Sequence, residues 1–167
     1  MAKVWENRIV GTGEEPPEQL MANPFNWRIH PKVQQEALEG ALDQIGWVQQ
    51  IVVNRRTGHV VDGHLRVTLA MRRNEASVPV LYVDLSEDEE RLALATLDPI
   101  SAMAAADDVK LGELLAQVEV QEAGLAALLQ DLKAKSTLPE SWPEYDESAA
   151  DGVEWLTCPK CGHKWLK

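Results

Sequence analysis

The chain has 167 residues, a formal net charge of −11 at pH 7 and an ordinary globular composition, which allow one domain of usual size with an appendage. No apolar stretch is long enough to span a membrane, and the first residues lack the apolar core of a secretory signal, so we expect a cytoplasmic protein. The excess of acidic residues lies in residues 81–152. Nucleic acid, which is itself negatively charged, would therefore have to contact the charge-balanced residues 1–80 or the C-terminal tail.

The N-terminal part predicts one short strand and one helix. Residues 7–10 favour a strand, and the turn-rich residues 11–17 and 24–31 predict loops. A helix is expected over residues 31–45, because apolar residues recur there at the spacing of one helix face. These residues are Val33, Ala37, Leu38, Ala41, Leu42 and Ile45. Gly46 then suits the position just after the helix ends.

Strands and helices alternate over the next part of the chain. We predict strands at 48–54, 59–61 and 78–85, and helices at 63–73 and 87–97. A capping box of Ser86 and Glu89 begins the second helix, and Asp98-Pro99 is expected to end it. The alternation, with some antiparallel pairing, predicts a compact α/β or α+β domain with a mixed sheet.

A helical extension, a linker and a small tail are expected to follow this domain. Leucine patterns predict two helices in residues 99–135, packed as an antiparallel pair against the domain or a partner chain. Residues 136–152 are polar, acidic and proline-bearing, as is typical of a flexible linker. We therefore divide the chain into a domain at 1–98, the extension at 99–135, the acidic linker at 136–152 and a half zinc-ribbon tail at 153–167.

The tail holds both cysteines of the chain, in the run Cys158-Pro-Lys-Cys161-Gly-His163. This run has the form of a zinc knuckle, with Cys158, Cys161 and His163 as candidate ligands, whereas a structural zinc site takes four. Two chains could share one site, another histidine could complete it, or the run could be a remnant. The other interpretation is a reduced CxxC without metal.

The run VVDGHLR at residues 60–66 is the most informative local pattern. An apolar strand end passes through Asp62 and Gly63 into residues that favour a helix rather than a returning hairpin strand. Glycine lets the backbone approach a ligand closely, and the first N–H groups of a helix attract anions. His64 and Arg66 add side-chain donors in the same turn, so the sequence predicts a phosphate-binding loop.

Each polar side chain of this turn has a functional and a structural interpretation. His64 would be a hydrogen-bond donor or proton shuttle, or else a helix-capping or surface residue. Asp62 would orient His64 or Arg66 or bind a metal, or else it is the N-cap of the following helix. Arg66 would bind a phosphate, or else pair with a neighbouring carboxylate.

The loop at 24–31 supplies a second group of candidates. Arg28 is expected to contact a ligand, and His30 is a second, less favoured candidate for such a contact. Trp27 would stack on a base, or else pack in the core, as aromatic residues more often do.

Three segments in chain order, at 22–31, 42–54 and 60–66, resemble the N-terminal domain of the ParB/sulfiredoxin superfamily. The resemblance covers roughly residues 7–97 and implies a compact α/β nucleotide-binding fold. Gly63 and Arg66 match the Gly-x-x-Arg box that lies at the phosphates in that superfamily. Asn23 and Arg28 match the Asn-Pro…Arg segment, so the resemblance adds them, with His64, to the nucleotide-binding candidates.

The chain also departs from two branches of that superfamily. Sulfiredoxins carry a catalytic cysteine where this chain has His64, so it does not resemble a sulfiredoxin in its chemistry. Chromosome-partitioning ParB proteins show Glu-Arg where this chain has His64-Leu65, and residues 109–134 are too short for their helix-turn-helix domain. The layout is most similar to short ParB-like proteins of phages and mobile elements.

This resemblance implies a nucleotide-binding protein that acts as a DNA-associated accessory or regulatory factor. The expected cofactors are ATP, ADP or CTP with Mg²⁺, and zinc at the tail. The expected partners are DNA or a DNA-modifying enzyme, and a second copy joined through the helical pair or a shared zinc. The alternatives are a small enzyme of the superfamily, a free amino-acid kinase, NTPase or nuclease with Asp62 and His64 as catalytic residues beside Arg66, and an interaction protein whose site has decayed.

Overall fold

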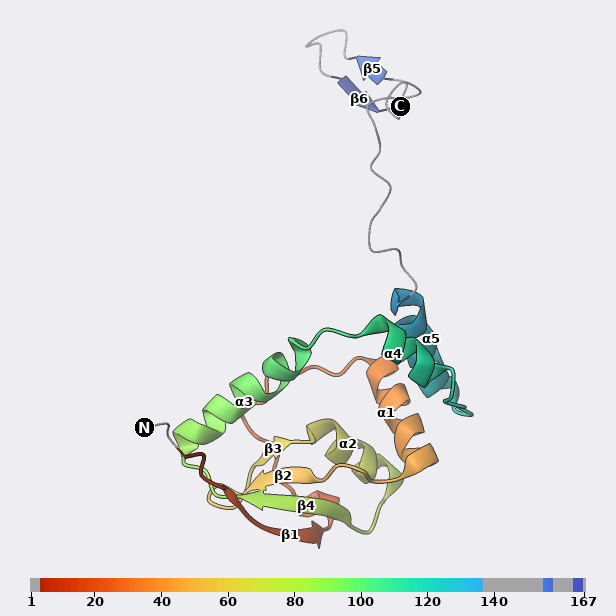
Figure 1. Ribbon diagram of the computed structural model, residues 1–167. Helices are drawn as coiled ribbons and strands as arrows, with labels where there is room; N and C mark the ends of the chain where they lie inside the picture. The colour runs from red at the N-terminus through yellow and green to blue at the C-terminus, as the bar shows by residue number, and fades with distance from the viewer. Residues whose placement is uncertain (1–3, 137–154, 158–163, 167) are drawn as a thin grey trace. The chain divides into compact units, whose positions relative to one another are not determined.

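The structure is a computed structural model that describes residues 4–136, 155–157 and 164–166 (Figure 1). Residues up to Ser136 form one compact unit. In the second unit, strands β5 (Trp155–Thr157) and β6 (Lys164–Leu166) pair antiparallel. Within the described residues, no helix is both long and apolar enough to cross a membrane.

A four-stranded mixed sheet forms the base of the first unit. Its strands are β1 (Ile9–Glu15), β2 (Ile51–Asn54), β3 (Val60–Asp62) and β4 (Val78–Val83). They lie in the order β1-β4-β2-β3; β1 and β4 are antiparallel, β4 and β2 parallel, and β2 and β3 antiparallel. The mixed α/β sheet expected from the sequence is therefore confirmed.

The first strand differs from its prediction. The sequence favoured a strand at 7–10 and a loop at 11–17, whereas β1 runs from Ile9 to Glu15. Pairing with β4 along this whole length outweighs the local turn preference of Gly11 and Gly13. Gly13 lies under the ring of Tyr82, where a Cβ would be 3.4 Å from the ring carbon Cε2.

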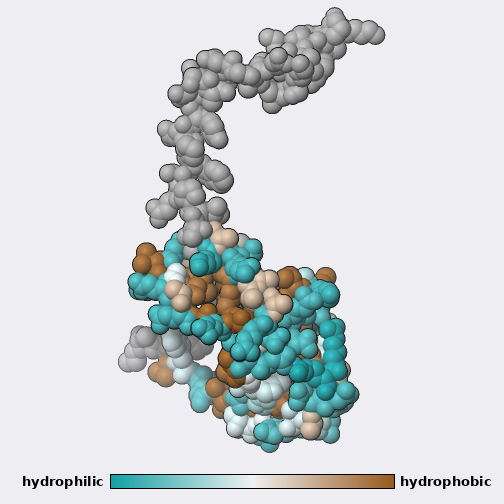
Figure 2. All heavy atoms as spheres, turned by 90° about the vertical axis from the view of Figure 1, so that its right-hand side faces the viewer, coloured by the Kyte–Doolittle hydropathy of each residue, from teal (hydrophilic) through white to brown (hydrophobic). Residues whose placement is uncertain are grey.

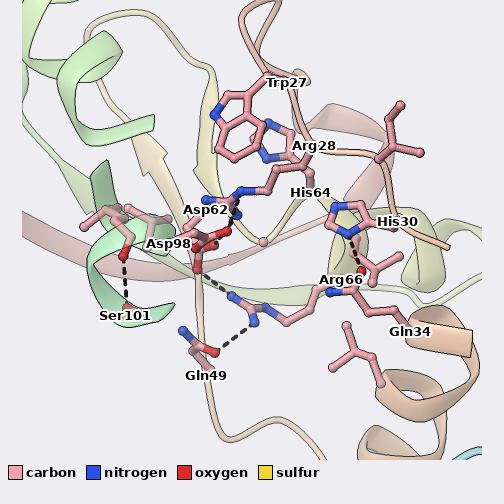
Figure 3. A pocket seen from close by; sticks show the side chains of 16 residues that line it. Trp27, Arg28, His30, Gln34, Gln49, Asp62, His64, Arg66, Asp98 and Ser101 are labelled. Carbon is pink, nitrogen blue, oxygen red and sulfur yellow. Dashed lines mark hydrogen bonds and ion pairs between the residues drawn. The ribbon is translucent and has the colours of Figure 1, made fainter. Parts of the chain in front are cut away.

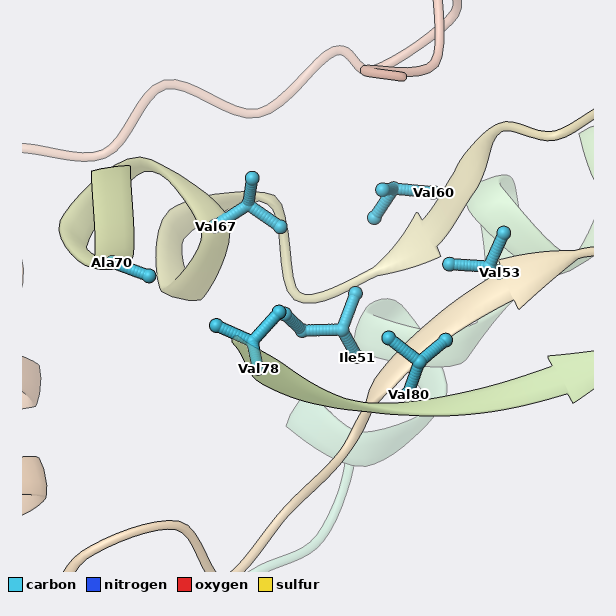
Figure 4. Close-up of a cluster of buried hydrophobic side chains, with 7 residues drawn as sticks. All are labelled: Ile51, Val53, Val60, Val67, Ala70, Val78 and Val80. Atoms are coloured by element: carbon cyan, nitrogen blue, oxygen red, sulfur yellow. The ribbon is translucent and has the colours of Figure 1, made fainter. Parts of the chain in front are cut away.

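The hydrophobic core lies between the sheet and helix α2 (His64–Arg73), which Figure 1 shows over one face of the sheet. Its central side chains, drawn in Figure 4, are Ile51, Val53, Val60, Val67, Ala70, Val78 and Val80. They come from β2, β3, α2 and β4, and the partly buried Trp47 packs against them. Burying each of the larger ones contributes about 1.5–3 kcal/mol, so the core holds the junction of β3 and α2 firmly in place.

Two longer helices flank this junction. Helix α1 (Lys32–Ile45) matches its prediction and ends at Gly46, whose φ is +74°. Helix α3 (Glu87–Ala102) begins at the predicted capping box on Ser86 and Glu89. The short 3-10 helix η1 (Pro17–Gln19) precedes the loop that leads to α1.

Helix α3 does not end at Asp98-Pro99 as predicted, but continues through Pro99 to Ala102. Proline removes one helical hydrogen bond. Here the last turn is held from outside, because Asp98 forms an ion pair with Arg28. Within the turn, the Ser101 hydroxyl donates to the Leu97 carbonyl at 2.9 Å. The expected domain boundary after residue 98 falls inside this helix.

The two predicted helices of the extension are α4 (Asp108–Leu115) and α5 (Ala123–Ser136). Helix α5 contacts both α4 and α1, so the pair packs against the domain, the first of the two arrangements expected. A Cβ on Gly124 would lie 2.9 Å from the Glu36 backbone, and a Cβ on Gly40 would lie 2.9 Å from Glu122 Cβ. Glycine at both positions therefore lets α5 approach α1 closely.

Candidate functional site

A cavity of about 720 Å³ lies where β3 passes into α2, between α1 and α3 (Figure 3). Ligand pockets typically measure roughly 300–1,000 Å³. The polar side chains that line it are Arg28, His30, Gln34, Gln49, Asp62, His64, Arg66, Asp98 and Ser101. The structure thus brings together the candidates of both loops, Asp62 to Arg66 and Trp27 to His30.

Gly63 forms the turn between strand and helix, as the sequence predicted. It is the N-cap of α2, and its φ of +99° is one that glycine adopts readily. A Cβ there would lie 3.2 Å from Ile51 and 3.3 Å from the Arg66 guanidinium, so the glycine also makes room for that arginine. The first helical bond runs from the Val67 N–H to the Gly63 carbonyl at 3.0 Å, which leaves the preceding N–H groups of the turn for an anion.

Arg66 is held by protein partners on most of its guanidinium. Its Nη2 donates to Asp62 Oδ2 at 2.8 Å, and its Nη1 donates to Gln49 Oε1 at 2.9 Å. Its Nε is the one buried side-chain polar atom without a hydrogen-bond partner in the described part of the chain. In the structure, Arg66 thus forms an ion pair with a neighbouring carboxylate, as its structural interpretation predicted.

Asp62 is the last residue of β3 and lies between two arginines. It pairs with Arg66 at 2.8 Å, and its Oδ1 is 3.7 Å from Arg28 Nη1. The alternative of an N-cap is wrong, because Gly63 occupies that position and no side chain caps the helix. Asp62 instead orients Arg66, one of the functions that the sequence suggested.

Arg28 is the more exposed of the two cavity arginines, with 17% of its side chain exposed against 12% for Arg66. Its Nε pairs with Asp98 on α3, whereas its two Nη nitrogens make no hydrogen bond within the described residues. From the sequence, Asp98 was expected only to end a helix together with Pro99. Its ion pair with Arg28 was therefore not predicted. The two arginines and two aspartates of the cavity balance one another in charge.

His64 lies at the start of α2, and its surroundings define its protonation. Burial, and then the positive charge of Arg28, lower the pKa of His64 below its ordinary value. Its Nε2 faces the backbone N–H of Asn23 at 3.3 Å and so accepts a hydrogen bond. The neutral ring therefore carries its proton on Nδ1, which makes His64 a hydrogen-bond donor through that atom.

Asn23 does not place its side chain among the residues that line the cavity. The side chain is buried, with Nδ2 donating to Glu90 Oε1 at 2.7 Å and Oδ1 accepting from the Phe25 N–H at 3.0 Å. Asn23 reaches the cavity only through the bond from its backbone to His64. Glu90 was not a candidate in the sequence, where it is one of several acids at the start of a helix.

Trp27 forms part of the cavity wall. The alternative that it packs in the core is wrong, because the residue is 60% exposed. Its indole N–H donates to the Leu94 carbonyl on α3 at 3.2 Å, which fixes the edge of the ring. In the same loop, His30 Nδ1 lies 3.0 Å from Gln34 Oε1. Stacking of Trp27 on a base stays a prediction.

The candidate zinc ligands Cys158, Cys161 and His163 lie outside the described residues. Within the described residues, no group of three or more histidine, cysteine, aspartate and glutamate side chains could hold a metal ion. Zinc in the tail therefore stays a prediction.

Comparison with known proteins finds a solved structure of similar fold. No family model and no curated protein matches the sequence. The C-terminally truncated chromosome-partitioning protein ParB from Caulobacter crescentus, complexed with CTP-gamma-S, is similar over 78% of this chain and 81% of its own, with 23% identity and a TM-score of 0.51.

Two structures of a pNOB8-like ParB N-domain share 16% and 17% identity with this chain at a TM-score of 0.47. They match 96% and 98% of this chain, which covers 59% and 56% of theirs. From the similarity to the Caulobacter protein, the chain has a ParB-like fold.

Proposed function

We propose that the chain binds a nucleotide in the cavity at the start of α2, with the phosphates against the helix N-terminus and Arg28. The observation that carries this proposal is the meeting of open backbone N–H groups, the Nη nitrogens of Arg28 and the exposed ring of Trp27 in one cavity. The first two bind anions, and an aromatic face suits a base. The similar ParB structure, which holds CTP-gamma-S, supports a nucleotide as the ligand.

Magnesium would reach this site together with the nucleotide. The cavity carboxylates Asp62 and Asp98 are both engaged by arginines, and the described residues hold no cluster of three metal-binding side chains. Magnesium is commonly held by one or two carboxylates and the substrate phosphates. We therefore expect Mg²⁺ to strengthen triphosphate binding mainly through the phosphates.

Calorimetric titration with CTP, ATP and ADP, each with and without Mg²⁺, tests the proposal. We expect one of them to bind, and Arg28→Ala to weaken its binding about tenfold or more, as the loss of a charge-assisted hydrogen bond does. Arg73→Ala is the matched control, because Arg73 lies at the far end of α2, paired with Asp43. Absence of binding, or equal affinity of Arg28→Ala and wild type, would contradict it.

We further propose that the protein acts on or near DNA as an accessory factor of the short phage type, rather than as an enzyme. The charge-balanced N-terminal part and the ParB-like fold support this role. For catalysis, a general base needs a free acceptor atom within reach of the substrate, whereas Asp62 pairs with two arginines and His64 already uses Nε2 as an acceptor. Fluorescence polarisation with duplex DNA, with and without nucleotide, tests the role, and phosphate release abolished by His64→Ala would favour the enzyme.

A further inference from the structure

A buried carboxylate outside the cavity ties the site to the rest of the domain. Glu90 of α3 is only 4% exposed, and we call it and its four partners the Glu90 hub. The partners are Asn23 Nδ2 at 2.7 Å, Asn54 Nδ2 at 2.5 Å, Thr57 Oγ1 at 2.6 Å and His59 Nδ1 at 3.5 Å. The hub thereby joins three parts of the fold: the loop before α1, the turn between β2 and β3, and α3.

These contacts keep Glu90 charged despite its burial. Burial alone would raise the pKa of Glu90, but hydrogen bonds from Thr57, Asn54 and Asn23 outweigh it and hold the pKa below its ordinary value. A buried charge persists only where such partners satisfy it, and removing one partner is costly. The hub is thus a rigid point from which the loop at Asn23 is held.

That loop in turn fixes the ring of His64. The Asn23 side chain is bound to Glu90, while the Asn23 backbone N–H donates to His64 Nε2 at 3.3 Å. With Nε2 used as an acceptor, the neutral ring has its proton on Nδ1. A chain of contacts therefore runs from a buried carboxylate to a side chain that lines the cavity.

We propose that Glu90 is a positioning residue for the ligand site: through Asn23 it holds His64 in the Nδ1–H form, as a neutral donor to a ligand anion. The proposal rests on the proposed nucleotide site for its ligand. The tautomer of His64, by contrast, is a property of the free protein. The two proposals can therefore fail separately.

The test is Glu90→Gln, which keeps the size of the side chain and removes its charge. Long-range ¹H–¹⁵N NMR of histidine-labelled protein at pH 8 reads the tautomer of His64, and calorimetry reads nucleotide affinity. We expect the wild type to show the Nδ1–H form and the variant to show mixed tautomers. Its affinity should fall about fivefold, the worth of one ordinary hydrogen bond.

The matched control is Glu89→Gln on the same helix. Glu89 binds Arg8 through both oxygens at 2.7 Å and has no contact with Asn23. A purely structural effect would lower the melting temperature of both variants and leave the His64 tautomer unchanged. If Glu90→Gln fails to fold, Asn23→Ala takes its place, because it leaves Glu90 with its other partners.

The outcomes separate the proposals. An unchanged Nδ1–H form in Glu90→Gln, or in Asn23→Ala where that variant replaces it, overturns the positioning role, as does wild-type affinity. If the wild type binds no nucleotide, the proposed function fails, while a tautomer change in the variant still supports the positioning of His64. A change of both tautomer and affinity supports the whole proposal.

Discussion

In the proposed nucleotide site, Asp98 would compete with the ligand for the charge of Arg28. The Asp98 carboxylate is 47% exposed and pairs with Arg28 Nε, so it stands where a phosphate would also gain by binding. Since exposed ion pairs are worth only about 0.2–1 kcal/mol, the competition is modest. The direction of its effect on nucleotide affinity can nevertheless be measured.

Asp98→Asn should therefore bind nucleotide more tightly than the wild type, by about two- to fivefold, because it removes a competing negative charge. Asp88→Asn is the matched control, as Asp88 lies on the same helix, is 95% exposed and pairs with Arg91. Calorimetry at one ionic strength measures both variants. A weaker or unchanged affinity of Asp98→Asn would mean that this carboxylate does not compete.

Some residues of the site could be predicted from a local sequence pattern, and others could not. Gly63 and Arg66 lie within four residues of each other at a strand-to-helix junction, so a local pattern found them. Asp98 and Glu90 act through partners more than 30 residues away. Their burial and pairing depend on how α3 packs against the loop before α1. A local sequence pattern carries no information about this tertiary contact.

At the scale of elements, the sequence predicted the type of most helices and strands but not all of their ends. Helix α1 and helix α2 have strong periodicity and clear end residues, and their bounds agree with prediction within a residue. Strand β1 and the last turn of α3 depend on contacts with β4 and Arg28, which outweigh local glycine and proline preferences. Tertiary contacts therefore determine the element ends that were not predicted correctly from the sequence.

The contact between α1 and α5 depends on the absence of a side chain at Gly124. Gly124→Val should destabilise the protein by about 1–3 kcal/mol, since its side chain would meet the Glu36 backbone. Gly112→Ala in α4 is the control, because nothing lies within 4 Å of a Cβ there, and alanine should be neutral or stabilising by up to about 1 kcal/mol. Urea denaturation compares them, and equal stability of Gly124→Val and wild type would disprove the close contact.

At the scale of the whole molecule, the helical extension and the tail are the parts through which a second copy would join. Figure 2 shows hydrophobic side chains gathered on the face that carries the extension. The exposed large hydrophobic residues of the extension, residues 99–135, are Ile100, Met103, Val109, Leu114, Val118 and Leu128. A homodimer through the helical pair or the tail stays a prediction, and sedimentation at several concentrations would measure it.

Zinc content decides between the interpretations of the tail. If the knuckle binds metal, plasma emission spectroscopy of the purified protein should find zinc, and Cys161→Ser should lose it, because thiolates are its strongest ligands here. One zinc per two chains would indicate a shared site, and one per chain a site completed by another histidine. If the wild type contains no metal, the interpretation of the tail as a reduced CxxC without metal would remain.

The pairing of each cavity arginine with its own aspartate also affects how the site responds to salt. A bare cationic cleft gathers mobile counterions and releases them when a polyanion arrives, which makes its affinity fall steeply with ionic strength. Here Asp62 and Asp98 already serve as built-in counterions for Arg66 and Arg28. A ligand phosphate that engages Arg28 would exchange with a carboxylate of the protein itself, so the occupancy of this cavity should change little between dilute buffer and the salt of a cell.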